Sequence, residues 1–153
     1  MYSRNEAAQL KQEFWTVFGK YMTPVFSAEG EKISWINYKT GEKNIFFRLY
    51  ADAKKAGISI ELSHQDVELQ QLYYEQFVQL KKIFIMASGD DWIWELNVTG
   101  DDGKIISKIY KELTEVSVFK KEDWPKLIPF FKSNMIALDE FWSSAKYSFE
   151  LLR

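Results

Sequence analysis

The stretch WINYKTGEKNIFFRLYADAKKAGISIELSHQD, from Trp35 to Asp66, decides the fold. Apolar and polar residues alternate along it in three short runs, and turn-forming segments such as the one around Gly41 separate the runs. Alternation with a period of two is typical of β-strands, and short polar connections join strands that run antiparallel. The stretch therefore predicts a three-stranded meander, with strands at Ile33–Tyr38, Asn44–Ala51 and Ile58–Ser63. The second of these strands has bulky side chains on both faces, so we expect it in the middle of the sheet.

Helical periodicity flanks the meander. Apolar residues recur every three or four positions near residues 3–22, 66–84, 120–131 and 134–153, and this spacing predicts four helices. Pro129 is expected to kink or break the helix predicted at residues 120–131. Two further strands are expected at Trp92–Val98 and Lys104–Leu113. The predicted order is α-βββ-α-ββ-α-α, a single α+β domain over residues 1–153 with about five mostly antiparallel strands packed against helices.

The composition excludes several kinds of chemistry. The chain has 153 residues, a net charge of −2 and no cysteine, so disulfides, thiolate catalysis and cysteine-bound metal centres are excluded. His64 is the only histidine, which rules out a histidine-rich metal site, and we expect neither a metal nor a cofactor. The near-neutral charge argues against a dedicated basic nucleic-acid-binding domain. The N-terminal residues do not resemble a signal peptide, and no apolar run approaches the ~18 residues of a membrane-spanning helix. We therefore expect a cytoplasmic protein without a membrane segment.

Several longer sequence segments resemble those of a known family. They include SWINYKTG (34–41), FFRLYAD (46–52), ISIELSHQD (58–66), KKEDWP (120–125) and ALDEFW (137–142). Together they resemble a bacterial family known as a domain of unknown function, family 4268, over nearly the whole chain. The family brings no established activity. Because its members often follow a nuclease-like domain in longer proteins, the resemblance implies a role beside DNA restriction, repair or defence.

Two three-residue motifs match part of the site of a metal-dependent nuclease. Such an enzyme needs carboxylates that hold Mg²⁺ and a lysine that helps to activate water, often as an acid, any residue and a lysine. DAK (52–54) and DGK (102–104) fit this pattern, but both fall in predicted turns, where these residue types are common. The turn interpretation is preferred. A divergent Mg²⁺ nuclease that uses Asp52 or Glu61 with Lys54 is therefore the last of the functional hypotheses.

Arg48, Glu61 and His64 form a candidate polar site in the predicted sheet. Arg48 would bind a phosphate or a carboxylate, and His64 would pair with Glu61 or Asp66 at a strand end. The structural alternatives are that Arg48 pairs with an acid across the sheet, such as Glu61 or Glu95, and that His64 is a loop or capping residue. Neither a nucleophile elbow nor a phosphate-binding glycine loop accompanies these residues.

A second candidate surface combines aromatic and basic side chains. It consists of Trp92, Trp94, Lys104, Lys108 and Lys111 on the last two predicted strands. Such a combination is typical of surfaces that bind single-stranded nucleic acid, and it would also suit a protein partner. Tryptophans two positions apart on a strand are more common in the core, and the core is preferred for this pair. Asp139 and Glu140 are expected on the solvent-exposed face of the last helix.

The composition and the missing catalytic set favour a binding protein. Aromatic residues make up 17% of the chain, and aromatic surfaces favour association between proteins. We therefore expect a non-catalytic binding or assembly module rather than an enzyme, with a protein partner or a symmetric homodimer. The alternative is a nucleic-acid-associated accessory domain, which the resemblance and the run of Lys104, Lys108 and Lys111 suggest.

Overall fold

The computed structural model describes residues 3–153 and contains one antiparallel sheet with the strand order β1-β2-β4-β3. In chain order, the elements are α1 (Arg4–Met22), β1 (Ile45–Ala51), β2 (Lys55–Leu62), α2 (Val67–Gln79), α3 (Lys81–Ser88), β3 (Ile93–Thr99), β4 (Ile105–Thr114), the 3₁₀ helix η1 (Lys121–Asp123), α4 (Trp124–Ala145) and the 3₁₀ helix η2 (Lys146–Leu152). The predicted α+β class and the antiparallel sheet are confirmed. The sheet of the described residues has four strands instead of about five, and the strand and helix order differs accordingly.

Aspartate side chains close the turns of the two hairpins. The Asp52 carboxylate accepts hydrogen bonds at 2.8 and 2.9 Å from the backbone N–H groups of Lys54 and the next residue. Asp102 accepts from the N–H of Lys104 at 3.0 Å, beside Gly103, whose φ of 81° is free of strain only for glycine. Aspartate favours turns because it bonds to backbone groups two residues on. The interpretation of DAK and DGK as turns is therefore confirmed.

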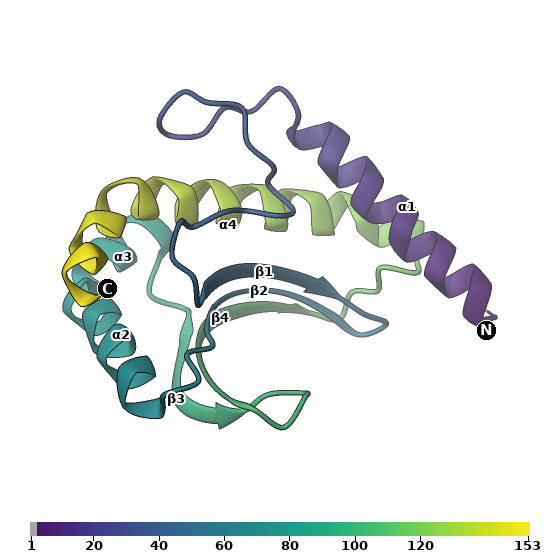
Figure 1. Cartoon of the computed structure of the whole chain (residues 1–153). Helices are drawn as coiled ribbons and strands as arrows, with labels where there is room; N and C mark the ends of the chain where they lie inside the picture. Colours follow the sequence, from purple (N-terminus) through teal and green to yellow (C-terminus); the bar gives the residue numbers. More distant parts are fainter. Residues whose placement is uncertain (1–2) are drawn as a thin grey trace.

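A bulge bends the edge strand β3. The register between β3 and β4 shifts between Glu95 and Val98, and Asn97 at this point has a φ of 53°. A bulge of this kind bends its strand and increases the local twist. Figure 1 shows the β3–β4 hairpin turning back beneath β1 and β2, so the sheet is concave on the side away from α4.

The helices cover the other face of the sheet. Helix α4 crosses this face, with α2 and α3 beside it and α1 against its first turns (Figure 1). The layer between helices and sheet is aromatic, and Phe77, Phe84, Phe141 and Trp142 are almost completely buried there. Burying one such side chain stabilises the fold by roughly 1.5–3 kcal/mol. Within residues 3–153, no helix has the length and apolar composition needed to cross a membrane.

The expected strand at Ile33–Tyr38 is wrong. These residues belong to an irregular segment, residues 23–44, which we name the strap. The strap is held by individual side-chain contacts instead of a backbone hydrogen-bond ladder. For example, the Trp35 indole N–H donates to the carbonyl of Val25 at 3.0 Å. With no strand before it in the sheet, β1 is an edge strand and not a central one.

Two helix boundaries also differ from expectation. The helix predicted for residues 66–84 is divided at Leu80 into α2 and α3, and Asp66 caps α2 by accepting two backbone N–H groups. The two final helices are one, α4, with Pro129 inside it. Pro129 lies in the second turn, where it removes one backbone hydrogen bond, and the buried Leu127 and Phe131 on either side hold the helix together.

Candidate functional site

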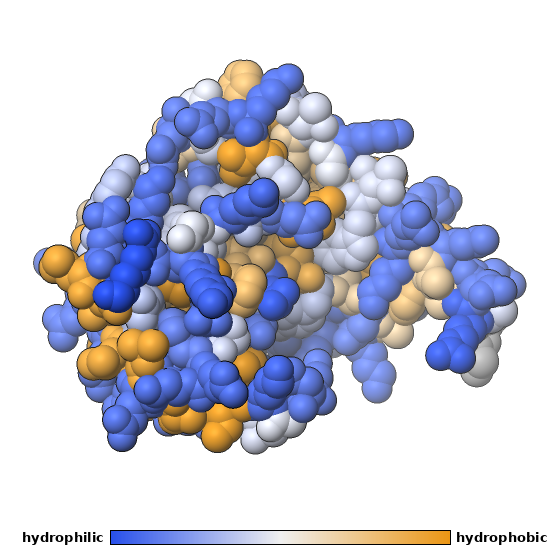
Figure 2. Space-filling view, in the orientation of Figure 1, coloured by the Kyte–Doolittle hydropathy of each residue, from blue (hydrophilic) through white to orange (hydrophobic). Residues whose placement is uncertain are grey.

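The face of the sheet opposite α4 forms a groove of about 1370 Å³, which we name the sheet groove. Alternate residues of β1, β2 and β4 form its floor, and the β3–β4 turn and the segment after β2 contribute to its rim. The main floor residues are Arg48, Tyr50, Ser59, Glu61, Lys108, Tyr110 and Glu112. Figure 2 shows the hollow below β1 and β2 and above the β3–β4 turn, with hydrophilic side chains along its rim.

Strand pairing places these side chains in rows across the sheet. Arg48 lies opposite Ser59, which in turn lies opposite Tyr110. In the next row, Glu61 lies opposite Lys108. Directly opposed residues have Cβ atoms roughly 5 Å apart and can contact one another. The groove floor is therefore a direct product of the two-residue period of the strands.

Opposite charges pair along the floor. Arg48 Nε lies 3.1 Å from Glu61 Oε2, with the two side chains 51% and 22% exposed, and Lys55 Nζ lies 3.0 Å from Glu112 Oε2. The Arg48 guanidinium also lies 4.4 Å from the centre of the Phe46 ring. Partly exposed pairs of this kind contribute about 0–1 kcal/mol each. Their main effect is to fix the directions of charged groups that solvent and ligands can still reach.

Tyr50 lies flat over Gly57 and fixes one end of the floor. A Cβ atom at Gly57 would lie only 2.1 Å from the tyrosine ring, so glycine is needed there. The Tyr50 hydroxyl donates to Glu112 at 2.7 Å, and burial together with this bond raises the pKa of Tyr50. Burial opposes ionisation of Glu112, but the hydrogen bonds from Tyr50 and Lys55 outweigh it and lower the pKa of Glu112. At neutral pH the pair is a neutral donor and an anion.

All three residues of the candidate polar site line the sheet groove, and two of them, Arg48 and Glu61, contact each other. Arg48 and Glu61 form the ion pair that was one of the structural alternatives. His64 is 5% exposed, and its ring stacks at 4.2 Å on Tyr73 of α2, on the helix side of the sheet. Its Nδ1 has no hydrogen-bond partner among residues 3–153. Burial lowers the pKa of His64, and the nearby Glu42 opposes this effect only in part.

The residues of the candidate aromatic and basic surface lie on different sides of the sheet. Trp92 is 6% exposed and belongs to the core, whereas Trp94 is only partly buried and packs at 5.5 Å against an α3 phenylalanine at the edge of the core. Lys104 and Lys108 line the sheet groove. Lys111 pairs at 3.1 Å with an aspartate that precedes β3. These five side chains do not form one continuous platform.

The acids of the nuclease hypothesis are both held by other groups. The Asp52 carboxylate accepts the backbone N–H of Lys54, and this bond lowers the pKa of Asp52. Glu61 is paired with Arg48. In the part of the chain that the structure describes, no group of three or more Asp, Glu or His side chains is arranged to hold a metal ion.

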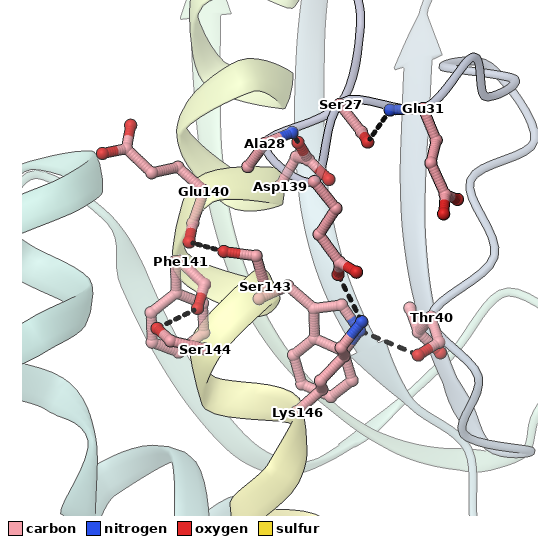
Figure 3. A network of polar contacts seen from close by, with 12 residues as sticks. Ser27, Ala28, Glu31, Thr40, Asp139, Glu140, Phe141, Ser143, Ser144 and Lys146 are labelled. Carbon is pink, nitrogen blue, oxygen red and sulfur yellow. Dashed lines mark hydrogen bonds and ion pairs between the residues drawn. The ribbon is translucent and has the colours of Figure 1, made fainter.

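A second concavity, of about 400 Å³, lies between the strap and α4, and we name it the clasp pocket. Asp139 of α4 is 5% exposed, and its side chain forms hydrogen bonds to the strap. Its carboxylate accepts the Tyr38 hydroxyl at 2.6 Å and the backbone N–H of Ala28 at 2.7 Å. The Trp142 indole N–H donates to the carbonyl of Thr40 at 2.8 Å (Figure 3). Together these bonds fasten both halves of the strap to one helix.

The family comparison covers both concavities. The family described as Domain of unknown function (DUF4268) matches residues 10–146. The chain belongs to this family. No curated protein and no solved structure matches the chain. The DUF4268 match spans all four strands and α4, so the sheet groove and the clasp pocket both lie within it.

Within the DUF4268 region, the sequence prediction for Asp139 is wrong. Asp139 was expected on the solvated face of its helix beside Glu140, but only Glu140 is exposed. The helical spacing contained a usable signal: Asp139 follows Met135 by four positions and precedes Trp142 by three, and both of these residues are buried. An acid on the apolar stripe of a helix needs hydrogen-bond donors, and the strap supplies them.

Proposed function

We propose that this chain is a non-catalytic binding module whose sheet groove binds a polar segment of another protein. The observation that carries the proposal is the uncovered concave sheet face. Sheets usually bury one face and solvate the other, but a solvated face that curves around a groove of about 1370 Å³ offers far more contact area than a flat one.

The charge balance of the groove favours a polypeptide. Among residues 3–153, the lining includes five basic side chains and five acidic ones. Polypeptide segments carry both signs of charge, whereas nucleic acids present a uniformly negative backbone. Arg48 is half exposed and stacked on Phe46, so it meets a partner's carboxylate in a fixed orientation. Complementary charges of this kind contribute specificity and a faster association rate.

Nucleic acid is the second candidate ligand. Lys43, Lys104 and Lys108 all line the groove and supply the observation in its favour. Because the five acidic side chains of the lining balance its five basic ones, we expect weak binding to nucleic acid, and this binding should fall steeply as salt rises. A nuclease that uses Asp52 or Glu61 ranks last, since both carboxylates are already hydrogen-bonded or paired.

Selection from a displayed library of random 12-residue peptides tests the proposal. We expect enriched peptides to bind the wild-type protein, and to bind Arg48→Glu at least tenfold more weakly. Lys126→Glu is the matched control, because it reverses the sign of an exposed α4 lysine outside the groove lining. If selection yields nothing that Arg48→Glu weakens, the groove is not a peptide site.

Two further measurements separate the other partners. A low-salt titration with labelled single- and double-stranded DNA, with and without Mg²⁺, tests nucleic acid and cleavage together. Salt-sensitive binding that Lys108→Glu removes would favour the accessory-domain alternative. Light scattering over a concentration series tests a homodimer, and a monomer at every concentration would exclude a second copy as the partner.

A further inference from the structure

The clasp pocket contains a buried negative charge without a positive partner. Both groups that donate to the Asp139 carboxylate, the Tyr38 hydroxyl and the Ala28 N–H, are uncharged. Within residues 3–153, Asp139 forms no ion pair. Of the three lysines among the described residues that line the pocket, Lys146 is bound by Glu29 of the strap (Figure 3). Hydrogen bonds offset part of the cost of burying a carboxylate, but neither of these two donors brings a positive charge.

Tyr38 is a neutral donor to this carboxylate. Burial and the hydrogen bond to Asp139 raise the pKa of Tyr38 well above its ordinary value. The hydroxyl therefore stays protonated at physiological pH, and it supplies a hydrogen bond but no positive charge. Each carboxylate oxygen has one such bond and keeps capacity for another.

The pocket lining combines aromatic rings with charges of both signs, with Glu29, Glu31 and Asp139 beside Lys32, Lys39 and Lys146. The side chains of Tyr38 and Trp142 line it together with Asp139. Aromatic rings attract ammonium and guanidinium groups, and the attraction strengthens when the cation is shielded from water. A volume of about 400 Å³ lies at the small end of the range for small-molecule sites. The backbone carbonyl of Thr40 and the Ser34 hydroxyl add neutral polar groups in the strap.

We propose that the clasp pocket binds a small organic cation, with an ammonium or guanidinium group placed against the Asp139 carboxylate between the strap and α4. This site is separate from the sheet groove, on the helix side of the molecule, and it does not depend on the function proposed for the groove. Binding would also bring the strap and α4 together, because the cation would contact groups on both.

The test is a titration followed by ¹H–¹⁵N NMR of the full chain. The Trp142 indole N–H bonds to the strap carbonyl of Thr40, so its cross-peak reports on the pocket directly. The probes are n-butylammonium and n-butylguanidinium, with butyrate as the probe of opposite charge. We expect a saturable shift of the Trp142 signal with at least one cation and none with butyrate. Which cation binds more tightly distinguishes the ammonium from the guanidinium form of the ligand.

Two variants on one helix separate a local site from general charge attraction. Asp139→Asn keeps the shape of the side chain and removes the buried charge, and we expect binding at least tenfold weaker. Glu140→Gln removes the same charge from the neighbouring exposed position and should bind as the wild type does. Equal losses in the two variants, or an equal response to butyrate, would overturn the proposal, as would the lack of saturation in the wild type.

A third variant keeps the test decisive if Asp139→Asn does not fold. Tyr38→Phe keeps the aromatic ring and the carboxylate but removes one neutral donor, which leaves an oxygen of Asp139 free. We expect this variant to bind the cation at least as tightly as the wild type. Loss of binding in Tyr38→Phe with an intact fold, judged from its near-UV circular dichroism, would contradict the role assigned to Asp139.

Discussion

Replacing Gly57 by alanine should destabilise the protein through Tyr50, on the neighbouring strand. The new Cβ would lie 2.1 Å from the ring and 2.2 Å from the hydroxyl oxygen, so the tyrosine must move. Moving it breaks the 2.7 Å bond to Glu112, and a hydrogen bond to a charged group contributes about 1.5–3 kcal/mol. Alanine is better than glycine inside a strand by about 0.5–1 kcal/mol, which offsets part of the loss. The expected net loss in the free energy of unfolding is about 1–2 kcal/mol.

Urea denaturation of four proteins measures this effect. They are the wild type, Gly57→Ala, Tyr50→Ala and the double variant, followed by far-UV circular dichroism. Without the ring, the alanine meets no obstacle, so Gly57→Ala should be neutral or stabilising by up to about 1 kcal/mol in the Tyr50→Ala background. The reasoning is refuted if Gly57→Ala stabilises the wild type, or if it costs the same in both backgrounds.

Three further outcomes are expected. Burial lowers the pKa of His64, so between the folded and unfolded pKa values the unfolded chain binds more protons, and the free energy of unfolding should fall as the pH drops below 6.5. His64→Gln should remove this dependence when urea denaturation is compared at about pH 7.5 and pH 5.5. Gln70 is fully buried and its side chain forms three hydrogen bonds of 2.6–3.0 Å. Gln70→Ala should therefore lower the free energy of unfolding by about 2–4 kcal/mol in the same assay. The control Gln71→Ala, at an exposed position, should change it by less than about 0.5 kcal/mol. A double-mutant cycle on Arg48 and Glu61 should give a coupling of about 0.2–1 kcal/mol that declines in high salt; a larger, salt-insensitive value would show that the pair is not screened as its exposure implies.

The strands that could be predicted are those whose side-chain alternation matches real burial. Ile58, Ile60 and Leu62 are all fully buried, as their spacing predicted, and Ser59 and Glu61 face the groove. The segment at 33–38 also alternates, but its Trp35 and Tyr38 bind a carbonyl and a carboxylate instead of a neighbouring strand. The periodicity of apolar residues indicates which side chains are buried. It does not indicate whether a backbone hydrogen-bond ladder or a single polar contact of the side chain holds the segment in place.

The candidate site could be predicted only where its parts lie on adjacent strands. Arg48 was expected to pair across the sheet with an acid such as Glu61 or Glu95, and it pairs with Glu61 because strands joined by a short turn fix each other's register. His64 was placed with them because it is near in sequence. It does line the groove, but it lies two residues after the end of β2 and its ring stacks on Tyr73 of α2. The Asp139 contact joins positions that are about 100 residues apart, and no local rule predicts such a pair.

The contacts that hold the strap determine when it can join the rest of the fold during folding. Its hydrogen bonds and ion pairs to α4, η2 and the C-terminal Arg153 join residues between 101 and 117 positions apart. Closing a loop of that length costs roughly 4 kcal/mol in chain entropy before any of these contacts forms. The sheet hairpins close much shorter loops, so they can assemble early, while the strap has nothing to bind until α4 is in place. We therefore expect the strap to dock last during folding and to open first in the native state, with its amides exchanging their hydrogens while those of β2 and β4 remain protected.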